Sequence, residues 1–223
     1  GFSDTSYQSF VGAQSGMDLR TMNALIQSGI ADSKVSLFNR NHFYNPSNLA
    51  GEPTYILSYP EVCFCVAEAI NRGWIAGDAS QWYMNGITSQ FAFYGIEDGV
   101  NTVTLQAGSG AEIPYSVHFY YSTYFNQPAV QYAGDNTTGL AQILLQKYLA
   151  YARNSGYQAY YQWRRTGVPT FDQGPGTGNG GVIPRRWQYP QNEITANGTN
   201  LQAALQSQYG GNDDINQDMW LVK

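Results

Sequence analysis

The chain has 223 residues, enough to bury a substantial core without disulfides or metals. Charged residues make up only 12% of it, the formal net charge is −5, and aromatic residues make up 15%. This balance argues against nucleic-acid binding, which needs many cationic contacts to phosphates, and no apolar run approaches the roughly 18 residues that span a bilayer.

Residues 1–58 are mixed in character and rich in Ser, Asn and Gly, and they are predicted to be an irregular first segment. A short helix is expected between Asp18 and Ile30, with one apolar face formed by Met22, Leu25 and Ile26. Short extended pieces are expected at 36–38 and 42–44.

Residues 59–96 carry the clearest helical pattern. Pro60 stands at the first helical position, where its missing N–H does no harm, and Gly73 ends a helix over 59–73. Asp78 is the predicted N-cap of a second helix, from about Ala79 to Tyr94. The apolar stripe of the first helix is predicted to be Val62, Cys65, Val66, Ala69 and Ile70. Two such helices joined by a short turn form an antiparallel hairpin.

Cys63 and Cys65 are the only cysteines, and they fall within the first of these helices. Residues two apart in a helix point about 200° apart, so these two thiols cannot bridge each other. We expect both to be buried small hydrophobic residues, because a metal site would need more ligands at suitable spacing.

Residues 97–135 lack helical periodicity and are predicted to be an aromatic loop region. Residues 100–105 alternate only weakly between apolar and polar, and residues 115–125 are densely aromatic.

Residues 138–165 are predicted to be a pair of helices, from about Thr138 to Arg153 and from Tyr157 to Arg165. We expect this pair to pack against the hairpin as one unit, with Tyr148 in register with its apolar stripe. Residues 166–223 form an irregular C-terminal segment with one short helix, Leu201 to Gln208.

Two motifs are better explained by local structure than by ligands. Residues 176–181 match the GxGxxG spacing, but Pro184 blocks the helix that a dinucleotide site needs, so a surface loop is favoured. Residues 214–218 match the start of a calcium loop, but Met219 stands where the turn glycine belongs, which favours helix capping and turn roles.

The chain offers few groups for catalysis. Its two histidines are far apart in the sequence, and no serine stands in a G-x-S-x-G setting. Glu61 and Glu68 could share a helix face, as a carboxylate pair for glycoside hydrolysis would. Glu68 lies beside the apolar stripe, however, where a buried salt bridge to Arg164 or Arg165 is favoured. We therefore predict no catalytic site, no metal site and no cofactor.

Several pieces of the chain stand in one order and spacing across residues 59–223. They are Tyr59-Pro60-Glu61-Val62 through Ala67-Glu68-Ala69 to Arg72-Gly73-Trp74; Trp82-Tyr83 through Gly86-Ile87 to Tyr94-Gly95-Ile96; Gln146-Lys147-Tyr148 through Trp163-Arg164-Arg165-Thr166-Gly167; Ile183-Pro184-Arg185-Arg186 with Tyr189-Pro190 and Glu193; and the ending Gly210-Gly211 through Asp218-Met219-Trp220. In this set the chain resembles the SusD/RagB family, in particular the SusD-like branch with a WRRTG corner.

The resemblance implies a mainly α fold of tetratricopeptide-like helical hairpins with long irregular loops and no large sheet. Residues 1–223 would be the C-terminal portion of a single SusD-like domain, because family members are much longer. They begin with a lipidated cysteine, so membrane attachment is expected through an N-terminal lipid that is not present in this chain.

The resemblance also implies a function. Family members are cell-surface lipoproteins of Bacteroidetes outer membranes that lid a TonB-dependent, SusC-like β-barrel transporter. They capture oligosaccharides, or in some members peptides, without cleaving them. The alternative for this chain is a structural or assembly subunit that binds only protein.

The binding surface is expected where the resemblance is thinnest, between Asp98 and His118, because specificity usually lies on loops mounted on a rigid scaffold. The aromatic residues nearest this loop, which we expect to contact cargo or the barrel, are Tyr115, His118, Phe119 and Tyr120. The alternative is that they anchor the loop to the core.

A structural corner is expected from Glu68, Trp163, Arg164, Arg165 and Glu193. At least one of the two arginines should be buried and held by Glu68 or Glu193, because an unpaired buried guanidinium would be very costly.

Overall fold

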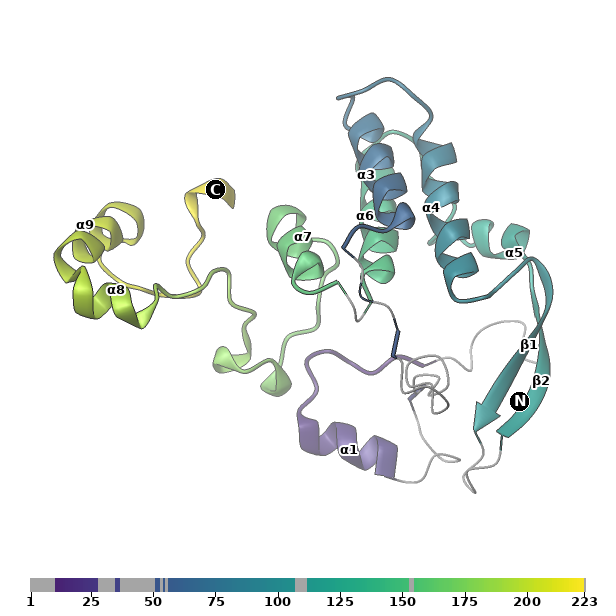
Figure 1. Cartoon of the computed structure of the whole chain (residues 1–223), viewed down its shortest axis with the longest axis horizontal. Helices are drawn as coiled ribbons and strands as arrows, with labels where there is room; N and C mark the ends of the chain where they lie inside the picture. Colours follow the sequence, from purple (N-terminus) through teal and green to yellow (C-terminus); the bar gives the residue numbers. More distant parts are fainter. Residues whose placement is uncertain are drawn as a thin grey trace. The chain divides into compact units, whose positions relative to one another are not determined.

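The computed structural model describes residues 11–27, 35–36, 51–52, 54, 56–106, 112–152 and 155–222. The chain divides into two compact units: the first holds the described residues among 1–12 and 25–170, the second those among 13–24 and 171–223. Helices dominate the described residues, and the one sheet among them has two strands, which confirms the mainly α fold without a large sheet (Figure 1). No helix within the described ranges is long and apolar enough to cross a membrane.

Helices α3 (Tyr59–Asn71) and α4 (Ala79–Phe93) form the predicted hairpin of the first unit. Each begins at a side-chain cap: Ser58 Oγ accepts a backbone N–H at 3.3 Å, and Asp78 Oδ1 accepts another at 3.1 Å. Gly73, with φ 72°, lies just beyond α3 in the left-handed conformation that ends many helices.

The buried face of α3 differs from the prediction. Of the predicted stripe the structure buries Ile70, and otherwise it buries the neighbouring stripe, formed by Pro60, Cys63, Phe64, Ala67 and Glu68. Cys65 is exposed, so the prediction of a buried thiol is right for Cys63 and wrong for Cys65. α3 is apolar on two adjacent stripes, and packing follows the one that carries the large ring of Phe64.

Helix α6 (Thr137–Ala150) packs against α3 and α4, and α7 (Gln158–Thr166) packs against α6, so the hairpin and the helix pair form one unit as predicted. Both helices lie within two or three residues of their predicted bounds. Tyr148 is half-buried rather than central. The core cluster is formed by Phe64, Ala67, Tyr83, Ile87, Val130, Ile143 and Ala150.

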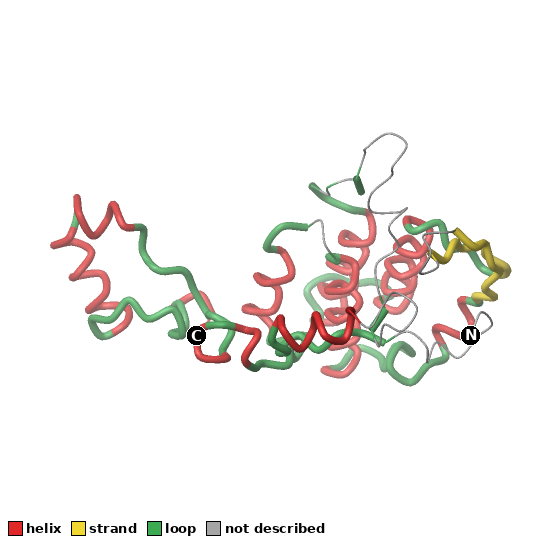
Figure 2. The backbone as a smooth tube through the Cα atoms, turned by 90° about the horizontal axis from the view of Figure 1, so that it is seen from below, coloured by secondary structure: helices red, strands yellow, loops and turns green. Residues whose placement is uncertain are grey.

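The region predicted to be an aromatic loop contains an antiparallel hairpin, so that prediction is wrong. Strands β1 (Gly99–Gln106) and β2 (Glu112–Phe119) pair with Gly99 opposite Phe119, and the short helix α5 (Tyr121–Phe125) follows. Figure 2 shows the strands as a narrow ribbon beside the helices of this unit. Val100 lies on the exposed face of β1 and Asn101 on the covered face, which weakens the alternation that marks a strand.

Helix α1 (Leu19–Gln27) lies within the predicted range, and its predicted apolar face is half-buried. The extended pieces predicted at 36–38 and 42–44 lie outside the described residues, apart from Ser36.

The second unit is mostly irregular, as predicted, but it has more helix than expected. Its short six-residue helix, Gln191–Ala196, has no apolar repeat and was not predicted. The elements of its C-terminal part are η2 (Pro175–Thr177), η3 (Asn179–Gly181), α8 (Gln191–Ala196), α9 (Gly198–Tyr209) and η4 (Trp220–Val222).

The glycine-rich segment of the second unit forms tight turns. Gly176 N–H donates to the carbonyl oxygen of Gly16 at 3.2 Å, and a Cβ on Gly16 would lie 2.8 Å from the backbone of Gln173. Close backbone approach accounts for these glycines.

Arg186 anchors the C-terminal end of the second unit. It is 2% exposed, its Nη1 lies 2.6 Å from Asp213 Oδ1, and its guanidinium lies 3.9 Å from the centre of the Tyr209 ring. Arg185 Nε donates to Asp218 Oδ1 at 2.7 Å. The carboxylates near the partial calcium motif therefore hold arginines, and no group of three or more potential metal ligands occurs in the described part of the chain.

Candidate functional site

The predicted corner forms around the carboxylate of Glu68, which is 4% exposed. Arg165 donates from Nη1 to Oε1 at 2.6 Å and from Nη2 to Oε2 at 2.9 Å, and Arg72 donates from Nε to Oε1 at 2.9 Å. The pairing of Glu68 with Arg165 is confirmed. The buried partner is the carboxylate, however, because the Arg165 side chain is 46% exposed.

The Glu68 carboxylate is held in its ionised form. Burial alone would raise the pKa of Glu68, but hydrogen bonds from Arg165 and Arg72, with the charges of Arg165 and Lys147, bring that pKa below its usual value of 4.5. Lys147 is itself 7% exposed and donates to Cys65 Sγ at 3.2 Å. Three cationic side chains therefore surround one carboxylate, which leaves an excess of positive charge.

The remaining corner residues have different roles. Trp163 is buried and stacks on Tyr160, with ring centroids 6.1 Å apart, and the Arg164 guanidinium lies 5.5 Å from the centroid of the same ring. Glu193 belongs to the second unit, where its Oε2 accepts a hydrogen bond from Asn197 at 3.0 Å.

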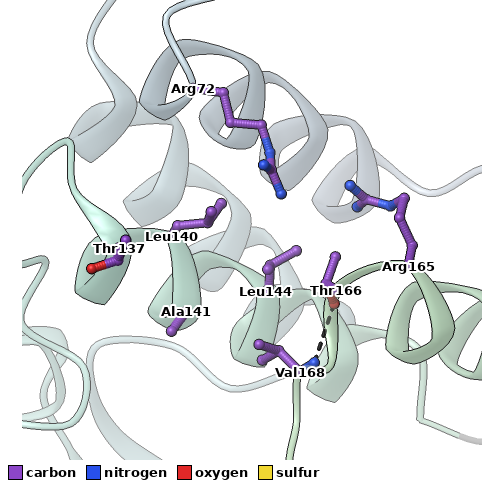
Figure 3. A pocket seen from close by; sticks show the side chains of 8 residues that line it. All are labelled: Arg72, Thr137, Leu140, Ala141, Leu144, Arg165, Thr166 and Val168. Carbon is purple, nitrogen blue, oxygen red and sulfur yellow. Dashed lines mark hydrogen bonds between the residues drawn. The ribbon is translucent and has the colours of Figure 1, made fainter. Parts of the chain in front are cut away.

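A pocket of about 370 Å³ opens beside this corner (Figure 3). Arg72, at the end of α3, and Arg165, on α7, point toward each other at its rim, and α6 supplies most of the floor. The Thr166 hydroxyl accepts the Val168 N–H at 3.2 Å, which holds the turn after α7 against the pocket. The lining residues are Arg72, Thr137, Leu140, Ala141, Leu144, Arg165, Thr166 and Val168.

Sequence reasoning missed this pocket. Arg72 follows the first predicted helix and Arg165 belongs to the WRRTG corner, but the two are 93 positions apart in the sequence (165 − 72). Only the packing of α3 and α7 around α6 brings them together. One indication in the sequence that these helices meet here was the predicted salt bridge from Glu68 to Arg164 or Arg165.

The predicted binding residues divide between the two faces of the β-hairpin. Phe119 is 5% exposed, and its ring centroid lies 4.6 Å from that of Phe91, so it belongs to an aromatic core. Tyr115, on the same face of the strand, is half-buried. His118 and Tyr120 are exposed on the opposite face, with ring centroids 6.5 Å apart. Contact with cargo or a partner stays a prediction for the exposed pair.

Comparison with known proteins assigns this chain to a family. A family model named SusD-like and described as starch-binding and associating with the outer membrane matches residues 4–190. A search of curated proteins found no match.

Solved structures agree with this family. A SusD homologue from Bacteroides fragilis is 30% identical, with a TM-score of 0.74 over 99% of this chain and 45% of its own. A second one from the same species is 28% identical, with a TM-score of 0.68 over 97% of this chain and 43% of its own. A chitin-binding protein is 30% identical, with a TM-score of 0.52 over 74% of this chain and 33% of its own. This chain thus spans less than half the length of these proteins, and it belongs to the SusD-like family of starch-binding proteins that associate with the outer membrane.

Proposed function

We propose that this chain is part of a non-catalytic, cell-surface nutrient-binding protein that captures oligosaccharides or peptides and lids a TonB-dependent, SusC-like outer-membrane transporter. The observation that carries the proposal is the family match over residues 4–190, whose description joins starch binding to outer-membrane association. The similar chitin-binding protein supports a saccharide as cargo.

The geometry of the first unit supports a binding role. Packed helices hold a hairpin that presents His118 and Tyr120 to solvent, and α3, α6 and α7 frame a pocket rimmed by arginines. Binding sites usually combine an apolar or aromatic surface with a few fixed polar groups.

The carboxylates do not suit glycoside hydrolysis. A general acid needs a raised pKa, whereas ion pairs lower the pKa of Glu68 despite its burial. Glu61 is also engaged, because the Tyr151 hydroxyl donates to its Oε1 at 3.2 Å. These contacts favour capture of cargo over its cleavage.

The second candidate is an assembly subunit that binds only protein. The observation in its favour is a group of exposed apolar side chains at the start of α3: Ile56, Leu57 and Tyr59 are 101%, 68% and 58% exposed. Such a group is typical of a protein-contact surface.

Calorimetric titration with oligosaccharides from starch and chitin and with short peptides tests the proposal. We expect binding of at least one class, no new products by chromatography, and co-purification of a β-barrel transporter from outer membranes. Cleaved products would overturn the non-catalytic role. Co-purification with no binding of saccharide or peptide would favour the assembly role.

A further inference from the structure

The pocket beside the Glu68 corner holds hydrogen-bonding groups that the protein does not use. Arg72 donates to Glu68 through Nε alone, and its two terminal nitrogens have no protein acceptor among the described residues. The Thr137 hydroxyl, at the other end of the pocket, is likewise without a hydrogen bond in the part of the chain that the structure describes. The Arg72 side chain is 29% exposed and lines the pocket.

The charge around the pocket selects an anion. Arg72 and Arg165 line it, no carboxylate does, and Glu68 behind them balances only one of the two charges. Lys147 adds a further positive charge close to Glu68. Because Nε of Arg72 is occupied, the free edge of its guanidinium is the pair of terminal nitrogens, a planar fork that matches both oxygens of a carboxylate.

The floor of the pocket selects an apolar group next to that anion. It is formed by the aliphatic side chains of Leu140, Ala141, Leu144 and Val168. The volume of about 370 Å³ lies at the small end of the range of ligand pockets, which suits one amino-acid residue or one sugar ring. A bare inorganic anion would leave this floor uncovered.

We propose that this pocket binds a carboxylate carried on a small apolar group, as at the C-terminus of a peptide that ends in an aliphatic residue. The inference rests on the proposed function, in that it names the class of cargo. An acidic sugar carries the same carboxylate, but the lining has no aromatic ring for a sugar face to stack on, which favours the peptide.

Calorimetric or NMR titration of the 223-residue chain tests the inference with matched pairs of probes. One pair is the tripeptide Ala-Ala-Leu with a free carboxylate and the same tripeptide amidated. The other pair is methyl glucuronide and methyl glucoside. A charged bidentate contact should make the free tripeptide bind about tenfold or more tightly than its amide.

Two substitutions in the pocket and one control outside it locate the effect. Arg72→Gln should abolish the preference for the free acid, while Arg165 still holds Glu68. Arg185→Gln is the matched control, because the Arg185 side chain is 32% exposed and pairs with Asp218 in the second unit. It should leave the preference unchanged. Ala141→Phe should fill the pocket and weaken both tripeptides, and thermal melting verifies that each variant folds.

Each outcome is decisive. Equal binding of acid and amide, or a preference that survives Arg72→Gln, overturns the inference. Preference for the glucuronide alone overturns the peptide assignment, and the carboxylate is then that of a sugar. These small probes report on the pocket whether or not a transporter co-purifies, so failure of the proposed import role is seen separately.

Discussion

The ring of Phe64 on α3 lies against the backbone of Gly86 on α4. A Cβ at position 86 would lie 2.7 Å from the Cε1 and Cζ atoms of this ring, closer than real contacts allow. Phe64 is 1% exposed and cannot move aside without disturbing the core. The absence of a side chain at Gly86 therefore sets how closely the two helices approach.

Gly86→Ala should destabilise the chain even though alanine favours helix. The added methyl group overpacks the Phe64 site, which typically costs about 1–3 kcal/mol and outweighs the gain in helix propensity of about 1 kcal/mol. Urea unfolding followed by circular dichroism measures the change. Gly198→Ala, at the start of α9 with no atom within 4 Å of the added Cβ, is the control and should be neutral or slightly stabilising. Equal stability of the two variants would contradict the close packing.

Glu68→Gln should lower the free energy of unfolding at neutral pH by about 2 kcal/mol. Removing one partner of a fully buried ion pair costs about 3–5 kcal/mol, and the partial exposure of Arg165 and Arg72 reduces this value. Glu97→Gln changes an exposed carboxylate with no ion pair among the described residues, so it should have little effect.

The ion pair between Glu68 and Arg165 also predicts how stability depends on pH. The pKa of Glu68 is lower in the folded chain than its usual 4.5, so its contribution to stability is complete above that pH and is lost as the pH falls through the folded pKa. The stability difference between wild type and Glu68→Gln should be constant above about pH 5.5 and should shrink in more acidic solution. A difference that grows on acidification would contradict the ion pair.

Buried tyrosines should make the fold sensitive to alkali. Burial raises the pKa of Tyr83 and Tyr124, and it raises the pKa of Tyr132 to about 12. In the unfolded chain these tyrosines ionise near pH 10, before they do so in the folded chain. The free energy of unfolding should therefore fall as the pH rises beyond that value.

Tyr83→Phe tests this explanation. The Tyr83 hydroxyl donates to the Val130 carbonyl oxygen at 2.9 Å in the core, so its loss should cost about 1–2 kcal/mol at pH 7. The variant should then lose less stability than wild type between pH 9 and about pH 11, because it has one fewer shifted phenol. Urea denaturation midpoints measure this, and Tyr157→Phe at an exposed position is the control.

The helices of the first unit could be predicted because their signals are local. Ser58 and Asp78 are caps, and the apolar spacing of α4 and α6 is that of helices. The buried stripe of α3 could not be chosen locally, because it depends on the fit of Phe64 against Gly86. The pocket depends on Arg72 and Arg165, which only the tertiary structure brings together.

The β-hairpin could not be predicted from the sequence for a different reason. In β1 the apolar Val100 is on the exposed face and the polar Asn101 is on the covered face, so polarity does not alternate cleanly. The aromatic density of β2 was visible, but the face that each ring occupies follows from the register, with Val100 opposite His118.

Neighbouring residues of β2 should therefore respond very differently to substitution. Phe119→Ala removes a buried ring from the cluster around Phe91 and should cost about 3–5 kcal/mol. His118→Ala and Tyr120→Ala should each change stability by no more than about 0.5 kcal/mol, because both side chains are exposed. We expect the exposed pair instead to contribute to capture of cargo or to association with the barrel, so the double variant should weaken one of these while its unfolding curve matches wild type. An unfolded double variant would show that the rings serve the core. A folded one with unchanged capture and unchanged association would remove this face of the hairpin from the binding surface and leave the arginine-rimmed pocket as the remaining candidate site for cargo in the first unit.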